Sequence, residues 1–474
     1  MIEAKPLPLA LHSDRALPAE PGVRAIAREI LDHTEPLPVV SMHGHVDISV
    51  FVDNEPFPDP AGLFIRPDHY LTRMLGSQGI GRAQLLGEPG WSSDPRATWR
   101  SFCEGWRYYR GTPTRYWLED VFGGLLGITE QPSADNADRL YDQIAEQLAD
   151  PAFRPLALLD RFNIEIISTT DAATDDLAGH RELAERLGDR VPPTFRPDAL
   201  LAIAAPDWPD QLALLERANG REIGDYASFI GALEDRRRHF IANGARATDH
   251  AALTSDTTPL EPADAERLFA KALAGSANAA EQDAFWANMI FEFARMSTSD
   301  GLTMQFHPGS LRNYDPAVQA AWGPDVGYDI PIAVDYTRGL RPLLEAFGHH
   351  PRFTFIAFTL DEDTFSRELA PLAGVFPAMK LGAPWWFLDS RDGMRRYREA
   401  VTDAAGFYNT TGFVDDTRAF CSIPARHNLA RRVDAGFLAT LVAEHRLGID
   451  EAVETAIDLA YHLPKAAYPP LVTC

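Results

Sequence analysis

The chain has 474 residues, of which 45% are hydrophobic and 24% are charged, and these proportions exclude a disordered or fibrous protein. Acidic residues outnumber basic ones by 68 to 44, and no dense block of Lys or Arg is present, which argues against nucleic acid as a partner. No run approaches the roughly 20 apolar residues that span a bilayer.

The cysteines and the N-terminal stretch bear on the compartment. Cys103, Cys421 and Cys474 are widely separated and lack Cys-x-x-Cys spacing, which argues against a secreted disulfide scaffold or a thiolate zinc site. The stretch MIEAKPLPLALHSDRALPAE lacks the long apolar segment of a secretion signal. We therefore expect a cytoplasmic protein that binds neither nucleic acid nor membrane.

Short apolar segments alternate with longer helical stretches, a pattern that predicts parallel strands joined by crossover helices. Eight such units predict an α/β protein with a (β/α)₈ TIM-type barrel, of roughly 250 residues before insertions. The candidate strands are Pro38–His45, Ile164–Thr170, Arg190–Phe195, Arg246–Leu253, Leu302–Phe306, Phe353–Leu360, Phe376–Leu381 and Gly412–Asp416.

The gap between the first two candidate strands is far longer than one crossover helix requires. Stretches around Pro67–Leu75 and Leu140–Leu148 within it have helical patterns. The sequence therefore predicts three parts. Residues 1–50 hold the N-terminal segment and first barrel strand, residues 51–160 form a mainly helical inserted subdomain, and residues 161–474 complete the barrel.

A His-x-His pattern follows the first candidate strand. Side chains two apart on a strand project to the same side, so His43 and His45 can reach one ion beside the strand's end. The pattern alone is weak evidence. Its position favours a metal site, because barrel enzymes keep their working groups at the carboxyl ends of the strands.

Two further strand ends carry candidate ligands. His307 ends the fifth candidate strand, where a hydrogen-bonded loop histidine is the alternative interpretation. Asp416 ends the eighth, which neighbours the first strand in a closed barrel, so we expect Asp416 to complete a site with His43 and His45. We expect His307 to reach in across the mouth. Such nitrogen and carboxylate ligands suit one divalent ion, zinc first, although iron, manganese or cobalt accept similar donors.

Arginines also follow predicted strands. Arg196 lies at the end of the third candidate, Arg312 in the loop after the fifth, and Arg418 two residues beyond Asp416. A guanidinium binds a carboxylate through two parallel hydrogen bonds, which fixes orientation as well as charge. Surface ion pairing explains any one arginine but not the position of all three. The set therefore predicts an acidic substrate.

Taken together, these motifs resemble the uronate isomerases, a sugar-acid isomerase branch of the amidohydrolase superfamily, over most of the chain. The resemblance rests on the His-x-His start and on RPDHYLTRMLGSQG, STTDAATDDLAGH, PTFRPD, QFHPGSLRN, GPDVGYD, WWFLDSRDGM and DDTRAF followed by Arg426-His427. It implies reversible conversion of D-glucuronate to D-fructuronate and of D-galacturonate to D-tagaturonate. A homo-oligomer is also expected.

The resemblance also implies roles for individual residues. His43, His45 and Asp416 fall on metal-ligand positions, and His307 on one that is a ligand or close to it. The remaining positions are an active-site pair, His69 and Tyr70, substrate-binding Arg196, Arg312 and Arg418, and an aromatic wall formed by Trp385 or Trp386.

An aldose–ketose conversion of this kind moves a proton from C2 to C1 and exchanges a proton between two hydroxyl oxygens. Asp416 is the first candidate for the base that acts through a cis-enediol, and Tyr70, assisted by Arg418, for the hydroxyl proton. A metal-dependent hydrolase of the same superfamily is the alternative. The arginines and the presence of His250, where a bridging lysine would be expected, weigh against it.

Overall fold

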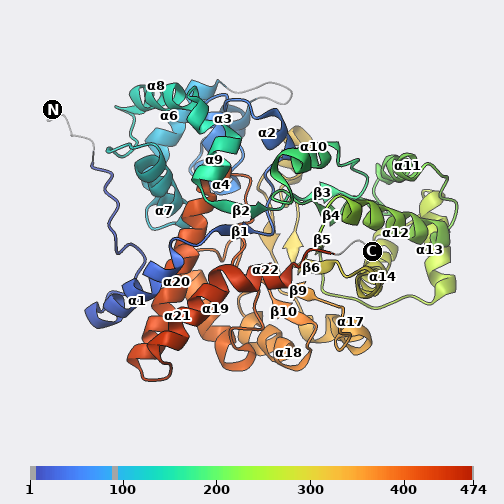
Figure 1. Ribbon diagram of the computed structural model, residues 1–474. Helices are drawn as coiled ribbons and strands as arrows, with labels where there is room; N and C mark the ends of the chain where they lie inside the picture. The colour runs from blue at the N-terminus through green and yellow to red at the C-terminus, as the bar shows by residue number, and fades with distance from the viewer. Residues whose placement is uncertain (1–6, 88–93, 472–474) are drawn as a thin grey trace.

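The computed structural model describes residues 7–87 and 94–471, with strands at the centre and helices around them (Figure 1). The strands are β1 (Val39–Ser41), β2 (Ile164–Ile167), β3 (Asp171–Ala172), β4 (Thr194–Arg196), β5 (Ala247–Ala252), β6 (Thr303–Pro308), β7 (Ser310–Leu311), β8 (Ile330–Pro331), β9 (Phe355–Ala357) and β10 (Met379–Leu381).

Helices make up most of the regular structure. Those up to β2 are α1 (Pro21–Thr34), α2 (Ile48–Asp53), α3 (Pro60–Phe64), α4 (His69–Ser77), α5 (Arg82–Leu86), α6 (Pro95–Gly105), α7 (Pro113–Glu119), α8 (Ala137–Leu148) and α9 (Pro155–Arg161). Those after it are α10 (Ala178–Leu187), α11 (Trp208–Asn219), α12 (Tyr226–Ala242), α13 (Pro262–Leu273), α14 (Ala279–Asp300), α15 (Pro316–Trp322), α16 (Tyr336–Gly339), α17 (Arg341–Phe347), α18 (Ala370–Val375), α19 (Arg391–Ala405), α20 (Ile423–Ala443), α21 (Ile449–Ile457) and α22 (Leu463–Ala467). Short 3₁₀ or π segments are η1 (Trp106–Tyr109), η2 (Asp120–Leu125), η3 (Pro151–Phe153), η4 (Asp198–Leu200), η5 (Phe365–Leu369), η6 (Phe420–Ser422) and η7 (Asp458–His462).

The sheets confirm the α/β class. A six-stranded parallel sheet has the order β10-β9-β6-β5-β4-β3, and β1 pairs with β2 in parallel. Within the larger sheet, helices connect strands that lie side by side, as parallel pairing requires. The short β7–β8 pair is antiparallel and lies outside this arrangement.

Each of the first seven candidate segments overlaps a strand, and the segment 246–253 forms one of the two longest. The eighth prediction, a strand over Gly412–Asp416, was wrong. Gly412 has φ 74° and Asp416 has φ 42°, and these left-handed conformations interrupt an extended backbone. The segment still lies between β10 and β1, because Thr411 N–H donates to the Leu381 carbonyl and Asp416 N–H donates to that of His43.

Helices α3 to α9 form a layer that packs on the first two strands. Trp99, Phe102 and Phe122 belong to the same buried cluster as Val39 of β1 and Ile164 of β2. Proline at the first turn and an aspartate cap begin several of these helices, as with Asp59 before α3 and Asp94 before α6. The division into residues 1–50, 51–160 and 161–474 stays a prediction.

Side chains from many strands meet in the interior. Val40, Ile166, Ala247, Ile356 and Val414 belong to one buried cluster, although they come from β1, β2, β5, β9 and the segment before Asp416. A larger cluster fills the space between β4 to β10 and the helices that follow them. Burial of these apolar side chains fixes the directions in which the strand ends point.

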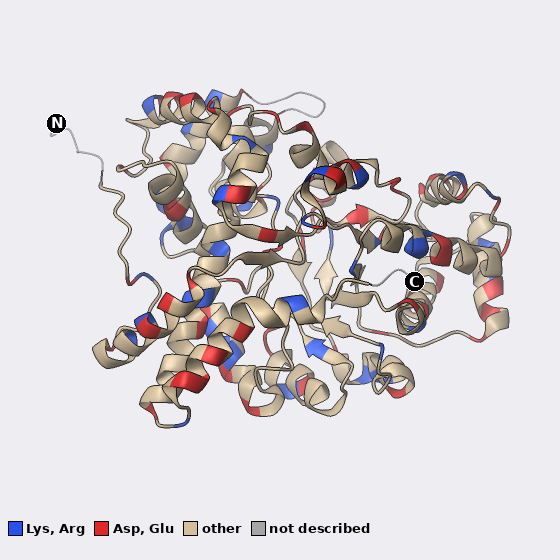
Figure 2. Ribbon diagram, in the orientation of Figure 1, with Lys and Arg blue, Asp and Glu red and all other residues tan. Residues whose placement is uncertain are grey.

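Residues of both charge signs are intermixed along the outer helices (Figure 2). Among residues 7–87 and 94–471, no helix is long and apolar enough to cross a membrane.

Candidate active site

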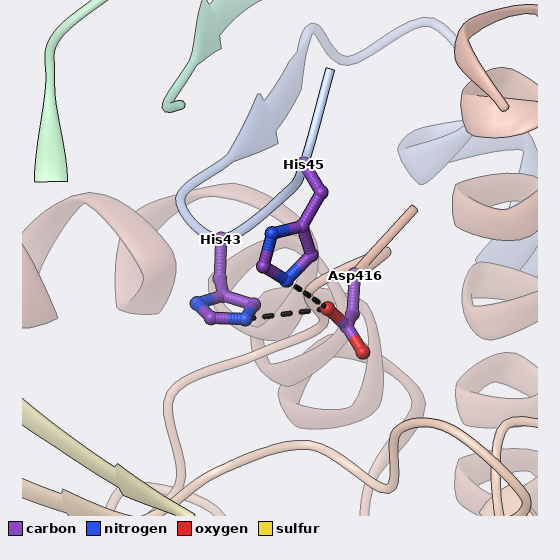
Figure 3. A group of neighbouring side chains, drawn as sticks. All are labelled: His43, His45 and Asp416. Atoms are coloured by element: carbon purple, nitrogen blue, oxygen red, sulfur yellow. Dashed lines mark ion pairs between the residues drawn. The ribbon is translucent and has the colours of Figure 1, made fainter. Parts of the chain in front are cut away.

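The side chains of His43, His45 and Asp416 point toward one another beyond the end of β1 (Figure 3). Oδ1 of Asp416 lies 3.3 Å from Nε2 of His43 and 3.1 Å from Nε2 of His45. One donor atom from each residue lies within 4.8 Å of the others, which is the spacing of a metal-ligand group. The expectation that Asp416 meets the two histidines agrees with this geometry.

Backbone hydrogen bonds hold this cluster together. Asp416 N–H donates to the carbonyl of His43 at 3.2 Å, and His45 N–H donates to that of Thr417 at 3.0 Å. Asp416 has a left-handed φ of 42°, which a residue other than glycine adopts only at an energetic cost, often at functional sites. This backbone conformation therefore helps to direct the Asp416 carboxylate toward the two histidines.

A fourth group, Asp249 on β5, lies behind the cluster. Its carboxylate is fully buried, with Oδ1 3.7 Å from Nδ1 of His43 and 2.9 Å from Nε2 of His307. Its Oδ2 lies 3.2 Å from Nη1 of Arg196. His307 therefore contacts Asp249 and, among the described residues, is not part of the His43–His45–Asp416 group.

Burial and neighbouring charges shift the pKa values of the three groups in the cluster in different directions. Burial opposes protonation of His43, but Asp249 and Asp416 outweigh it and raise the pKa of this imidazole. Burial lowers the pKa of His45 and outweighs the effect of Asp416. Burial also disfavours the Asp416 carboxylate, yet hydrogen bonds from His43 and His45 hold its pKa below the ordinary range. Asp416 is therefore ionised at neutral pH.

A pocket opens beside the cluster and gathers nearly all of the residues that the sequence predicted. Its wall includes His45, His69, Tyr70, Arg196, His307, Arg312, Trp385, Trp386, Asp416 and Arg418. His43 lies behind this wall, with only 2% of its side chain exposed.

Arg418 and Arg312 lie at the open part of the pocket. Arg418 donates to Nε2 of His69 at 3.1 Å and to Asp325, while Arg312 donates to Asp329 at 2.7 Å. The Arg312 guanidinium also lies 5.3 Å from the ring centre of Trp386. About a third of each side chain, 38% for Arg312 and 35% for Arg418, is exposed.

Arg196 is more enclosed than the other two arginines. Its Nε donates to Asp198 at 2.8 Å, and its Nη1 lies against Asp249. Asp198 in turn accepts the backbone N–H of Ala251 on β5, at 3.2 Å from Oδ2. Two carboxylates therefore hold this guanidinium against the inner wall of the pocket.

His69 and Tyr70 begin α4, whose N-terminus is capped by Asp68. The Asp68 carboxylate accepts the N–H groups of Tyr70 and Leu71, at 2.9 and 3.4 Å. The expected contact between Arg418 and Tyr70 is not formed. The Tyr70 hydroxyl donates to Asp389 at 2.7 Å, whereas Arg418 contacts His69.

Comparison with known proteins decides the family. The glucuronate isomerase family model matches residues 24–468. The chain belongs to the glucuronate isomerase family.

Relatives of this family are similar over nearly the whole chain. A uronate isomerase of Rhizobium meliloti is 52% identical over 464 residues, covering 97% of this chain and 99% of that protein. A crystal structure of glucuronate isomerase from Caulobacter crescentus has a TM-score of 0.95 and 45% identity, and covers 98% and 97% of the two chains. One of uronate isomerase from Thermotoga maritima has a TM-score of 0.91 and 26% identity, and covers 97% and 100%. The resemblance predicted from the motifs is confirmed.

Three charged residues at the site were not predicted from the sequence. Asp249 and Asp389 are buried carboxylates, and Arg426 is a buried guanidinium that also lines the pocket. An acidic residue inside the candidate strand 246–253 was an available signal for Asp249. Asp389 and Arg426 lie in motifs that supported the family resemblance, but their partners are distant in sequence.

Proposed function

We propose that the protein is a uronate isomerase that interconverts D-glucuronate with D-fructuronate and D-galacturonate with D-tagaturonate. The observation that carries the proposal is the convergence of the His43–His45–Asp416 group and three arginines in a single pocket, in a glucuronate isomerase family chain. An isomerase that acts on an acidic sugar needs guanidinium groups to bind the sugar's carboxylate, and the ligand group can hold an ion beside the reacting oxygens.

The fold supports a closed (β/α)₈ barrel with a helical insertion at residues 51–160. Hydrogen bonds join the segment before Asp416 to β10 on one side and to the end of β1 on the other. Ile167 and Thr169 likewise donate to the carbonyls of Arg190 and Pro192, just before β4, which links β2 to the six-stranded sheet. In this arrangement the pocket lies at the carboxyl ends of the strands, where barrel enzymes carry out their chemistry.

We propose that His43, His45 and Asp416 hold one divalent ion, with zinc as the first choice. Two imidazole nitrogens and a carboxylate oxygen suit this ion, and Nδ1 of the buried His43 has no hydrogen-bond partner among the described residues. His307, oriented by Asp249, lies close to this group. When bound, the ion would polarise and orient a substrate oxygen.

Binding is assigned to the arginines and the aromatic wall. Arg312 and Arg418 are the more exposed of the three arginines. Each is paired with an aspartate of the chain, and we propose that the carboxylate of the substrate replaces this aspartate when it binds. Arg196 keeps its two internal partners and is suited to contact a sugar hydroxyl. Trp385 and Trp386 would cover the apolar face of the sugar.

Proton transfer is assigned to Asp416 and Tyr70. The ionised Asp416 carboxylate would remove the C2 proton and return it to C1 on the same face, through a cis-enediol. Tyr70 would exchange the hydroxyl proton, and His69, held by Arg418, would position the substrate oxygen beside it. Anchoring the distant carboxylate by arginine keeps C2 against the base.

The test is an assay of ketose formation from each of the two uronates by protein of known metal content. We expect turnover by the wild type and a loss of about 100-fold or more in Asp416→Asn. Asp142→Asn, on the exposed surface of α8, is the matched control and should keep full activity. Hydrolysis of an ester or amide, without turnover of either uronate, would instead support the hydrolase alternative. A homo-oligomeric state and a cytoplasmic location stay predictions.

A further inference from the structure

A buried carboxylate, Asp389, lies directly behind Tyr70. It accepts the Tyr70 hydroxyl at 2.7 Å through Oδ1 and a hydrogen bond from Nη1 of Arg426 at 3.1 Å through Oδ2. Only 4% of its side chain is exposed. Tyr70 lines the pocket and Asp389 does not, so the Tyr70 hydroxyl gives its hydrogen to a carboxylate outside the pocket wall, and the lone pairs of the hydroxyl oxygen remain free to accept a second hydrogen bond.

The backbone before Asp389 is held in an unusual conformation. Trp386 has φ 25° and Phe387 has φ 43°, and residues other than glycine rarely adopt positive φ angles. Trp385 holds one end of this turn, because its Nε1 donates to the carbonyl of Thr359 at 3.2 Å. Strain of this kind persists where the surrounding structure fixes a side chain in place.

Arg426 is equally well fixed. Its Nε donates to the hydroxyl of Ser422 at 3.0 Å, and its guanidinium carbon lies 3.6 Å from the ring centre of Trp117. Its Nη1 also lies 3.4 Å from the carbonyl of Asp415. Arg426 is thus an internal counter-ion for Asp389, and its contacts orient the carboxylate toward Tyr70.

We infer that Asp389 is a positioning residue that takes up the hydroxyl proton of Tyr70 during isomerisation and then returns it. The inference rests on the proposed function of Tyr70. In the first half of the exchange, a substrate O–H bond breaks and its proton passes to the Tyr70 oxygen, while the tyrosine's own proton passes to Asp389. The reverse transfers deliver a proton to the neighbouring substrate oxygen. No proton is gained or lost overall.

The surroundings of the two groups agree with such a paired transfer. Burial raises the pKa of Tyr70 well above 10, and the adjacent Asp389 raises it further, so a free phenolate is disfavoured. Burial also raises the pKa of Asp389, despite the opposing effect of Arg426. The carboxylate is therefore a better proton acceptor than an exposed aspartate.

The decisive variant is Asp389→Asn, which keeps the shape and an oxygen acceptor for Tyr70 but does not take up a proton. We expect kcat to fall about 100-fold or more while KM stays within about twofold. Tyr70→Phe should cause a similar loss, and the double variant should lose little more than either single variant. A purely structural role would instead lower Tm or raise KM.

Several outcomes would overturn the inference. These are a kcat above half the wild-type value in Asp389→Asn, a change confined to KM, or a double variant whose loss is the product of the two single losses. If the Asn variant does not fold, Asp389→Glu takes its place, with an expected tenfold or greater loss of kcat that Tyr70→Phe barely increases. Wild-type kcat in that variant, or independent losses, would contradict the relay.

The same experiment separates this inference from the proposed function. If wild type and Asp389→Asn isomerise uronates equally well, the inference fails and the proposed function stands. If the wild type turns over neither uronate, the proposed function itself fails.

Discussion

His69 accepts a hydrogen bond from Arg418, with 3.1 Å between Nε2 and Nη1, and this contact joins the first turn of α4 to the segment after Asp416. A guanidinium only donates, so Nε2 of His69 must be unprotonated. Burial lowers the pKa of His69 to about 4, and the charge of Arg418 acts in the same direction. The contact therefore depends on a neutral imidazole.

The first prediction concerns the effect of pH on stability. Between pH 6.5 and about 4, His69 binds a proton in the unfolded state but not in the folded state, so its contribution lowers the free energy of unfolding as the pH falls. At pH 5 this effect is about 2 kcal/mol. Urea unfolding of wild type and His69→Gln at pH 7 and pH 5 should show a smaller loss in the variant. Equal losses would contradict the assignment.

The second prediction concerns the carboxylate that Arg418 binds in the absence of substrate. Asp325 is half exposed, so its ion pair with Arg418 is worth about 0–1 kcal/mol. Asp325→Asn should free the guanidinium for the uronate carboxylate and lower KM by up to about fivefold, as steady-state kinetics would show. An increase in KM would mean that Asp325 supports substrate binding rather than competing with it.

The third prediction uses two glycines of the same loop. Gly323 and Gly327 have φ of 84° and 86°, but a Cβ at Gly327 would lie 3.1 Å from Cβ of His69, whereas one at Gly323 meets no atom of the described residues within 4 Å. Alanine should strain the backbone similarly at both positions. Only Gly327→Ala should also displace His69 and lower kcat/KM, by about tenfold or more. Equal kcat/KM in the two variants would contradict this role of the loop.

The fourth prediction concerns metal removal. If His43, His45 and Asp416 hold an ion, a chelator should lower Tm and activity together, because a ligand that binds only the folded state stabilises it. Added zinc should restore both. The Asp416→Asn protein should show little response to either treatment. A chelator response of the same size in that variant would place the ion elsewhere.

Much of the fold and of the candidate site could be predicted from patterns within short segments of the sequence. Seven of the strands and most of the candidate site residues could be found because period, strand position and residue type are properties of short segments. His43 and His45, for example, lie two apart after an apolar run, and that spacing alone places them on one side of the chain. The arginines followed from the same rule about strand ends.

The contacts between distant segments could not be predicted in this way. The left-handed backbone at Gly412 and Asp416 replaced the eighth strand, and no periodic pattern encodes such an interruption. Arg418 contacts His69 and Asp325 rather than Tyr70, because the approach of α4 and the loop at residues 323–329 decides its partners. The Asp249 contact with His307 likewise depends on the register of β5 against β6.

The most direct test of isomerisation by proton transfer is an NMR measurement of D-glucuronate conversion in D₂O. We expect D-fructuronate that carries deuterium at C1, because the proton taken from C2 by Asp416 exchanges at least partly with solvent. With Asp416→Asn we expect ketose to form at least about 100-fold more slowly. Product from the wild type that carries no deuterium at C1, or full turnover by Asp416→Asn, would contradict this mechanism.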